Sequence, residues 1–123
     1  MTETERTHLD RIEVRGIHAW GHHGANPGEQ VVAQPLDIDV TFELDLRTAR
    51  ASDELADTVS YADVHATVVR IVATERFALL ERLGEVLLEA LMADPRIVCA
   101  AVSIAKPRLL DGATPVVVLR RER

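Results

Sequence analysis

The chain has 123 residues, of which 47% are hydrophobic and only 3% aromatic, and its formal net charge is −6 at pH 7. This length suits one domain with a modest core, and the acidic balance argues against a nucleic-acid binder. With a single cysteine, no run of about 18 apolar residues and a polar N-terminus, the sequence excludes a disulfide framework, a membrane span and a signal peptide, so we expect a cytoplasmic protein.

Two strands separated by a loop are expected first. Residues 1–8 are predicted to be a frayed end, and alternating side chains over 9–20 predict a strand that bends or bulges at Gly16. The segment 21–29 is too rich in Gly, Asn and Pro for regular structure. Strict alternation of apolar and mostly acidic residues over 36–46 predicts a second strand with one buried face and one solvent-exposed face.

Two helices follow. A polar connection over 48–59 leads to Ser60 and Asp63, which have the spacing of an N-cap and the third residue of a helix. A helix is therefore expected to begin at Tyr61. A second helix is predicted over about 79–92, where leucine and valine recur at helical spacing, and a proline shortly afterwards ends it.

The last third of the chain predicts two more strands. One begins near Ile97 and is closed by Pro107, a loop covers 108–114, and the last strand covers 115–121.

The predicted order β-β-α-α-β-β gives an α+β fold in one domain over 9–121, with 122–123 as its C-terminal end. Two helices can cover only one face of a four-stranded antiparallel sheet, so the other face and both edge strands stay exposed. Pairing of subunits edge to edge into a closed ring would cover the edges, and we therefore expect a homo-oligomer.

Lys106 is the only lysine beside thirteen arginines. Proton transfer is a task that an ammonium group can perform and a guanidinium cannot, so a single lysine in such a chain suggests this chemistry. Lys106 also ends an apolar row that includes Val102 and Ile104 on one face of a strand. The alternative, a surface lysine without a function, stays open on composition alone.

Three further residues are candidates, and each also has a plain structural interpretation. Tyr61 is the only tyrosine and lies at the start of a helix, where a phenolate or an anionic intermediate would be stabilised, but a packed aromatic with its hydroxyl in water is the more ordinary interpretation. Glu81, near the start of the second helix, could simply face the helix dipole. Glu29, at the end of the glycine-rich loop, could be an ordinary surface carboxylate.

Metal and nucleotide sites are not predicted. His22 and His23 are adjacent and therefore diverge, and no other ligand spacing accompanies them. The loop over 21–28 matches neither a phosphate-binding loop nor a dinucleotide fingerprint. We expect no metal and no cofactor.

In order and spacing, several stretches together resemble the dihydroneopterin aldolase family over nearly the whole chain, although each stretch alone is weak. They are Gly21-x-His23-Gly24-Ala25, Glu29, Asp39-Val40-Thr41, Asp57-Thr58-Val59-x-Tyr61-x-x-Val64, Leu79-Leu80-Glu81-x-Leu83 and Ile104-x-Lys106-Pro107. Two departures stand out: Ala33 replaces a usual glycine before Gln34, and residues 108–112 replace a proline-rich segment.

The resemblance implies the tunnelling fold, in which four subunits form a ring around a barrel, two rings stack into an octamer, and active sites lie between neighbouring subunits. It also implies the site residues. Those expected to act in catalysis are Glu29, Lys106 and Tyr61, the last reaching in from the neighbouring subunit, and those expected to bind the pterin are Glu81, Leu80 and Val59.

The implied activity is retro-aldol cleavage of 7,8-dihydroneopterin into 6-hydroxymethyl-7,8-dihydropterin and glycolaldehyde. General acid/base catalysis suffices, with neither a Schiff base nor a metal, because the C6=N5 imine of the substrate is the electron sink. Two alternatives stay open: a 2′-epimerase of dihydroneopterin or its triphosphate that uses the same residues, and a non-catalytic ring protein that binds a pterin or purine. Neither nucleic acid nor membrane is an expected partner.

Overall fold

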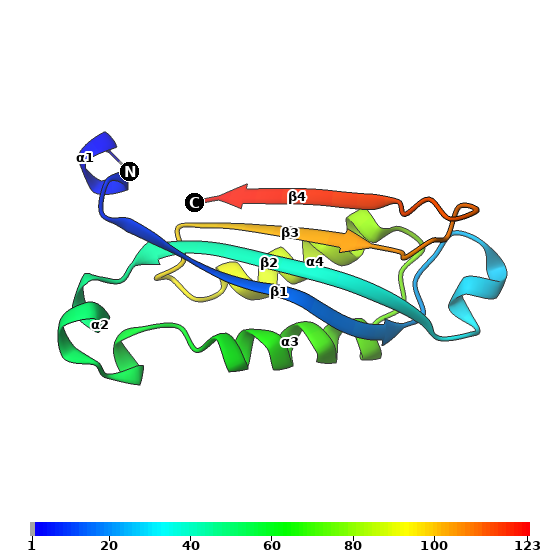
Figure 1. Cartoon of the computed structure of the whole chain (residues 1–123), viewed down its shortest axis with the longest axis horizontal. Coiled ribbons are helices and arrows are strands. Elements are labelled where there is room, and N and C mark those ends of the chain that lie inside the picture. The colour runs from blue at the N-terminus through cyan, green and yellow to red at the C-terminus, as the bar shows by residue number, and fades with distance from the viewer. Residues whose placement is uncertain (1) are drawn as a thin grey trace.

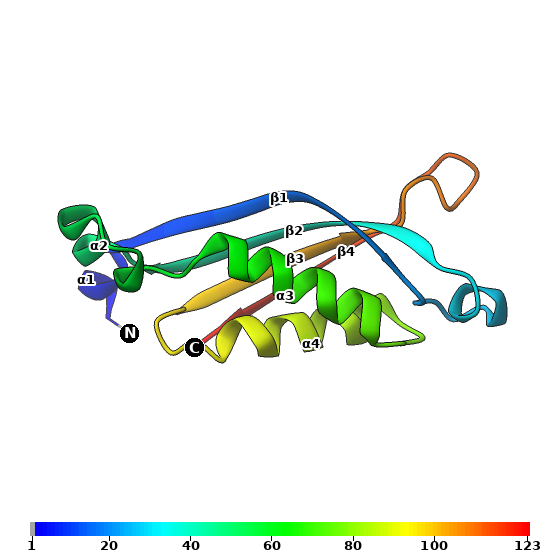
Figure 2. The ribbon, with the colours of Figure 1, turned by 90° about the horizontal axis from the view of Figure 1, so that it is seen from below.

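A computed structural model describes residues 2–123 and contains the four strands expected from the sequence (Figure 1). They form one antiparallel sheet in the order β1-β2-β3-β4. Two long helices lie on the same face of this sheet (Figure 2), so the predicted order and the single helix layer are confirmed. The bounds are β1 Leu9–Gly21, β2 Gln34–Asp45, α3 Tyr61–Thr74, α4 Leu80–Met92, β3 Cys99–Ala105 and β4 Val116–Glu122.

The bend predicted at Gly16 is a β-bulge. Val14 pairs with Val40 and Ile17 with Ile38, so β1 gains one residue on β2 between these two pairs. Gly16 has φ of +70°, which a glycine adopts without strain, and its N–H donates to the Asp39 carboxylate at 2.7 Å.

The core lies between the sheet and the helices. The inward side chains of β2 are at most 1% exposed, as its strict alternation predicts, and those of α3 and α4 recur at helical spacing. Core residues include Leu36, Ile38, Val40, Phe42 and Leu44 from β2, Val64, Val68, Ile71 and Val72 from α3, and Leu83, Leu87, Leu88 and Leu91 from α4.

Side chains satisfy backbone groups at one end of each long helix. The Ser60 hydroxyl accepts the N–H of Asp63 at 3.4 Å, which is the predicted N-cap of α3. At the end of α4, the Arg123 guanidinium donates to the carbonyl oxygens of Met92 (2.6 Å) and Asp94 (3.1 Å). Arg123 thus satisfies the Met92 carbonyl group, which the end of the helix leaves without a partner.

The segments predicted to be irregular contain short helices. The polar connection over 48–59 holds α2 (Arg47–Ser52) and the 3-10 helix η2 (Leu55–Asp57). A single turn, α1 (Glu3–Arg6), lies within the end that is predicted to be frayed, of which Met1 is outside the described residues. None of the described helices is long and apolar enough to cross a membrane.

The second face of the sheet and its two edges are open in the single chain. Figure 2 shows this face free of helices, and both β1 and β4 are edge strands. On β4, Val116 is 50% and Val118 is 69% exposed. An edge strand with exposed apolar side chains is suited to pairing with another chain.

Candidate active site

Lys106 and Glu29 form a buried ion pair. The Lys106 ammonium, one residue beyond the end of β3, donates to the Glu29 carboxylate at 2.5 Å, although the two residues are 77 positions apart. Their side chains are only 9% and 11% exposed. A lysine at the end of an apolar row thus meets a carboxylate from the glycine-rich loop, and the two form a charged pair that can carry protons.

A short 3-10 helix, η1 (Pro27–Gln30), holds Glu29 in place. The Glu29 N–H donates to the Asn26 carbonyl oxygen at 3.0 Å, and the Asn26 N–H donates to the Glu29 carboxylate at 3.2 Å. The Lys106 ammonium lowers the pKa of Glu29, and these Asn26 contacts add to the effect against the opposing effect of burial. Glu29 is therefore a carboxylate at neutral pH.

Gly24 makes room for the Glu29 side chain. A Cβ at position 24 would lie 2.3 Å from the carboxyl carbon of Glu29 and 2.5 Å from its Cβ, distances that no side chain tolerates. The glycine is thus needed for a close approach rather than for an unusual backbone angle.

His23 joins the same loop to the helix layer. It is 1% exposed; its Nδ1 accepts the N–H of Phe77 at 3.1 Å, and its Nε2 lies 2.9 Å from the Val72 carbonyl oxygen. Because one nitrogen must accept and the other must donate, the ring is neutral with its proton on Nε2. Burial lowers the pKa of His23, which favours this neutral form.

The sequence presents His23 as a candidate metal ligand and as part of the Gly21-x-His23-Gly24-Ala25 motif, but it does not predict this role. The available signal was the position of His23 directly before Gly24 in the sequence. The Gly24 N–H donates to the carbonyl oxygen of Phe77 at 2.9 Å, so both residues attach the loop to Phe77. Within residues 2–123, no group of three or more His, Cys, Asp or Glu is placed to hold a metal ion.

Glu81 lies at the same end of the sheet as the ion pair. Helix α4 begins beside the end of β3 (Figure 1), and a Cβ added at Gly84, one turn after Glu81, would meet the side chains of Leu119 and Ile104. The Glu81 side chain is exposed, whereas Leu80 is buried. The Glu81 carboxylate is therefore accessible to a substrate, and the Leu80 side chain is not.

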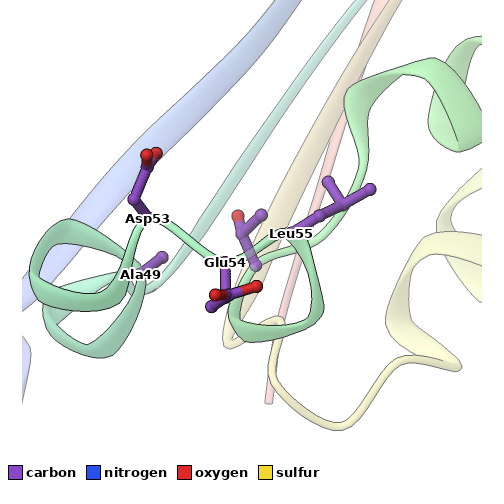
Figure 3. Close-up of a pocket in the computed structure, with 5 residues that line it drawn as sticks. Ala49, Asp53, Glu54 and Leu55 are labelled. Carbon is purple, nitrogen blue, oxygen red and sulfur yellow. The ribbon is translucent and has the colours of Figure 1, made fainter.

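Val59 and Tyr61 lie towards the opposite end of the sheet in the same chain, at the start of α3. Tyr61 is 68% exposed, and Val59 is buried. Both line a cavity of about 470 Å³ between η2, β1 and α3. A hollow of about 290 Å³ adjoins it, shares Leu55 and Thr58 with it and opens beside α2 (Figure 3).

The predicted site residues therefore fall into two groups within one chain. We call Glu29, Leu80, Glu81 and Lys106 the Lys106 half-site, and Val59 and Tyr61 the Tyr61 half-site. Helix α3 has 14 residues, so about 20 Å separates its two ends. Within a single chain, the two half-sites cannot contact the same small molecule.

Comparisons with known proteins agree with one another. The dihydroneopterin aldolase family model matches residues 12–119. The dihydroneopterin aldolase of Methylorubrum extorquens is 41% identical over 99 residues, which cover 80% of this chain and 76% of the relative. The dihydroneopterin aldolase of Streptococcus pyogenes serotype M18 is 37% identical over 99 residues, which cover 80% of this chain and 83% of the relative.

A solved structure shows the same likeness. The Escherichia coli dihydroneopterin aldolase, in complex with neopterin, superposes with a TM-score of 0.86 at 33% identity. The match covers 91% of this chain and 98% of the E. coli chain.

Proposed function

The chain belongs to the dihydroneopterin aldolase family, a family of lyases, and from this we propose how its two half-sites act. The substrate is 7,8-dihydroneopterin, which is cleaved into 6-hydroxymethyl-7,8-dihydropterin and glycolaldehyde. The pterin ligand of the E. coli relative supports this substrate class. The observation that carries the proposal is the buried ion pair of Lys106 and Glu29.

The bond that breaks joins C1′ and C2′ of the substrate side chain. A base removes the proton of the 2′-hydroxyl, the C2′ carbonyl forms, and the electrons of the broken bond move through C1′ to C6 and N5. N5 accepts a proton, and C1′ is then protonated as N5 gives its proton up. The imine already present in the substrate takes up the electrons, so the step needs no covalent bond to the enzyme.

Three residues divide the proton transfers. Lys106 manages the proton at N5 through a water molecule, and Glu29, its ion-pair partner, exchanges protons with it. Tyr61 and Glu29 serve the side-chain hydroxyl and the carbon centre. Glu81 accepts hydrogen bonds from the amino and ring N–H groups of the pterin in a bidentate contact. Because Leu80 and Val59 are buried, they bind through their backbone groups.

Each active site is completed by a second chain. The Lys106 half-site of one subunit faces the Tyr61 half-site of its neighbour, because helix α3, about 20 Å long, separates the two within one chain. The open edge strands β1 and β4 support a closed ring of four subunits, and stacking of two rings gives an octamer. The composition and the single buried cysteine, Cys99, favour the cytoplasm.

Incubation with 7,8-dihydroneopterin tests the activity. We expect release of glycolaldehyde in step with 6-hydroxymethyl-7,8-dihydropterin, measured by chromatography of the pterins and a coupled aldehyde assay. The Lys106→Ala variant should lose turnover and keep pterin binding. Formation of the 2′-epimer with no glycolaldehyde would replace the aldolase with an epimerase, and unchanged turnover in the variant would remove Lys106 from the chemistry.

Reduction with borohydride during turnover tests the absence of a covalent intermediate. A Schiff base on Lys106 would be trapped as a secondary amine and would add the mass of the reduced fragment to the chain. We expect the mass of the protein to stay unchanged after reduction. An adduct on Lys106 would contradict the mechanism but leave the overall reaction intact.

A further inference from the structure

The segment before the Tyr61 half-site is tied to the rest of the protein by one arginine. Arg96, which follows α4, donates through Nη1 to the carbonyl oxygens of Ala56 (3.3 Å) and Thr58 (2.9 Å), 40 and 38 positions earlier. Among residues 2–123, no other hydrogen bond reaches residues 54–60 from outside residues 46–64. The remaining bonds of the segment are local ones.

Arg96 is itself held by Asp94. Its Nε donates to Asp94 Oδ1 at 3.0 Å, its Nη2 to Oδ2 at 2.8 Å, and its backbone N–H to Oδ1 at 3.0 Å. This bidentate pair fixes the plane of the guanidinium and leaves Nη1 for the two carbonyl groups. The Arg96 guanidinium lowers the pKa of Asp94, which is therefore ionised at neutral pH.

The anchored carbonyl groups come directly before the residues that the active site needs. Thr58 lines the cavity of about 470 Å³ together with Val59 and Tyr61, and Arg96 does not line it. On the other side of Val59, the Ser60 cap fixes the start of α3. The backbone of the Tyr61 half-site is thus held between the helix cap and Arg96.

We infer that Arg96 is a positioning residue for the Tyr61 half-site. It acts through the carbonyl oxygens of Ala56 and Thr58, which set the course of the backbone into Val59 and Tyr61, and it does not contact the substrate. This inference rests on the proposed function, in which the Tyr61 half-site completes the active site of the neighbouring subunit.

The effect on catalysis follows from the loss of both anchoring bonds. In Arg96→Ala, kcat/KM for 7,8-dihydroneopterin should fall by roughly 10- to 100-fold, because a displacement of about 1 Å is enough to misplace a reacting group. Arg96→Lys should keep only part of the activity, since an ammonium cannot hold Asp94 in a bidentate pair and also reach two carbonyl groups.

Arg47 offers a matched control. It makes the same backbone and bidentate bonds to Asp45 as Arg96 makes to Asp94, with the same spacing in the sequence. The Arg47 side chain, however, makes none of its described hydrogen bonds to a carbonyl group of the chain. Arg47→Ala should leave kcat/KM unchanged.

Mixed oligomers separate a positioning role from general damage. When Arg96→Ala and Lys106→Ala chains are refolded together, some junctions combine an intact Lys106 half-site with an intact Tyr61 half-site. Random assembly at equal amounts gives about a quarter of such sites, so about a quarter of the wild-type activity should return. Mixing Arg96→Ala with Tyr61→Ala should restore nothing, because both lesions lie in the same half-site.

Each result decides a different point. The role of Arg96 would be overturned if the mixture of Arg96→Ala and Tyr61→Ala chains regained activity. It would also be overturned if Tyr61→Ala regained activity when mixed with Lys106→Ala but Arg96→Ala did not. Either result would leave the proposed function intact. No recovery from Tyr61→Ala with Lys106→Ala would instead overturn the shared active site. If Arg96→Ala does not fold, Arg96→Gln, which keeps a donor for one carbonyl group, enters the same mixtures.

Discussion

At the scale of single residues, the ion pair of Lys106 and Glu29 links stability to pH, besides its proposed role in catalysis. The lowered pKa of Glu29 means that the unfolded chain binds more protons than the folded one when the pH falls below the ordinary glutamate pKa of about 4.3. The stabilisation from the pair is therefore complete above that pH and is lost as the pH falls towards the lower pKa of the folded state.

Replacing the Lys106 ammonium group should change how the protonation of Glu29 affects stability. In Lys106→Met, the pKa of Glu29 should rise relative to the wild type, because burial, which raises the pKa, is no longer outweighed by the ammonium. Carboxyl ¹³C NMR over a pH titration measures it. Asp45, which Arg47 holds at a pKa of about 2, should keep its titration and serves as the internal control. An unchanged pKa of Glu29 would refute the pairing.

His23 should make the fold sensitive to mild acid. Burial lowers the pKa of His23 in the folded chain. Below about pH 6.5 the unfolded chain therefore binds a proton at this residue that the folded chain does not bind, and the free energy of unfolding falls. A glutamine at this position offers one donor and one acceptor without titrating. Between pH 7 and 5, the free energy of unfolding of the His23→Gln variant, measured by urea unfolding, should fall less than that of the wild type. Equal decreases in the two proteins would contradict the neutral tautomer.

At the scale of elements, the loop over 21–30 sets the position of the carboxylate. Gly24→Ala should push Glu29 away from Lys106, because the new Cβ would overlap the Glu29 side chain from its Cβ to its carboxyl group. We expect kcat/KM to fall by at least roughly tenfold. Gly28→Ala, in the same loop with nothing within 4 Å of its added Cβ, is the matched control. Equal activities of the two variants would show that the approach of Gly24 is not needed.

The sequence predicted the long elements and missed the short ones for a physical reason. Alternation over β2 and the apolar stripes of α3 and α4 reflect burial, which is a local property of the pattern. The helices α2 and η2 bury no residue, and part of their surroundings is fixed by Arg96 from about 40 positions away. No window of sequence contains such a contact.

The candidate site was predictable to a similar degree. The single lysine pointed to Lys106, but its pairing with Glu29 depends on a contact across 77 positions, and the residues alone gave Glu29 no special status. The family resemblance supplied it. The role of His23 was missed because both of its partners are backbone groups, at Val72 and Phe77, which carry no signal in the side-chain pattern.

At the scale of the whole molecule, the proposed shared active sites depend on pairing through the edge strands. Val118 is 69% exposed on β4, and a charge there is a known means of blocking edge-to-edge pairing. Val118→Asp should shift the protein to smaller species in sedimentation velocity and lower the activity in parallel. Val32→Asp, at a position that is 64% exposed outside the edge strands, is the control. A variant that stays assembled and active would argue against pairing through β4.

Helix α3 separates the two half-sites, and this constrains how the gene can change in length. One inserted residue in α3 would turn the part of the helix before it by about 100° relative to the part after it. Tyr61 would then lose the orientation that the proposed shared site requires, while Val72 still met His23. The hairpin over 108–114 has no such constraint, since its tip is exposed and closes on itself through the bridge of Leu110 and Ala113. Insertions and deletions compatible with activity should therefore accumulate in the hairpin and be absent from the helix.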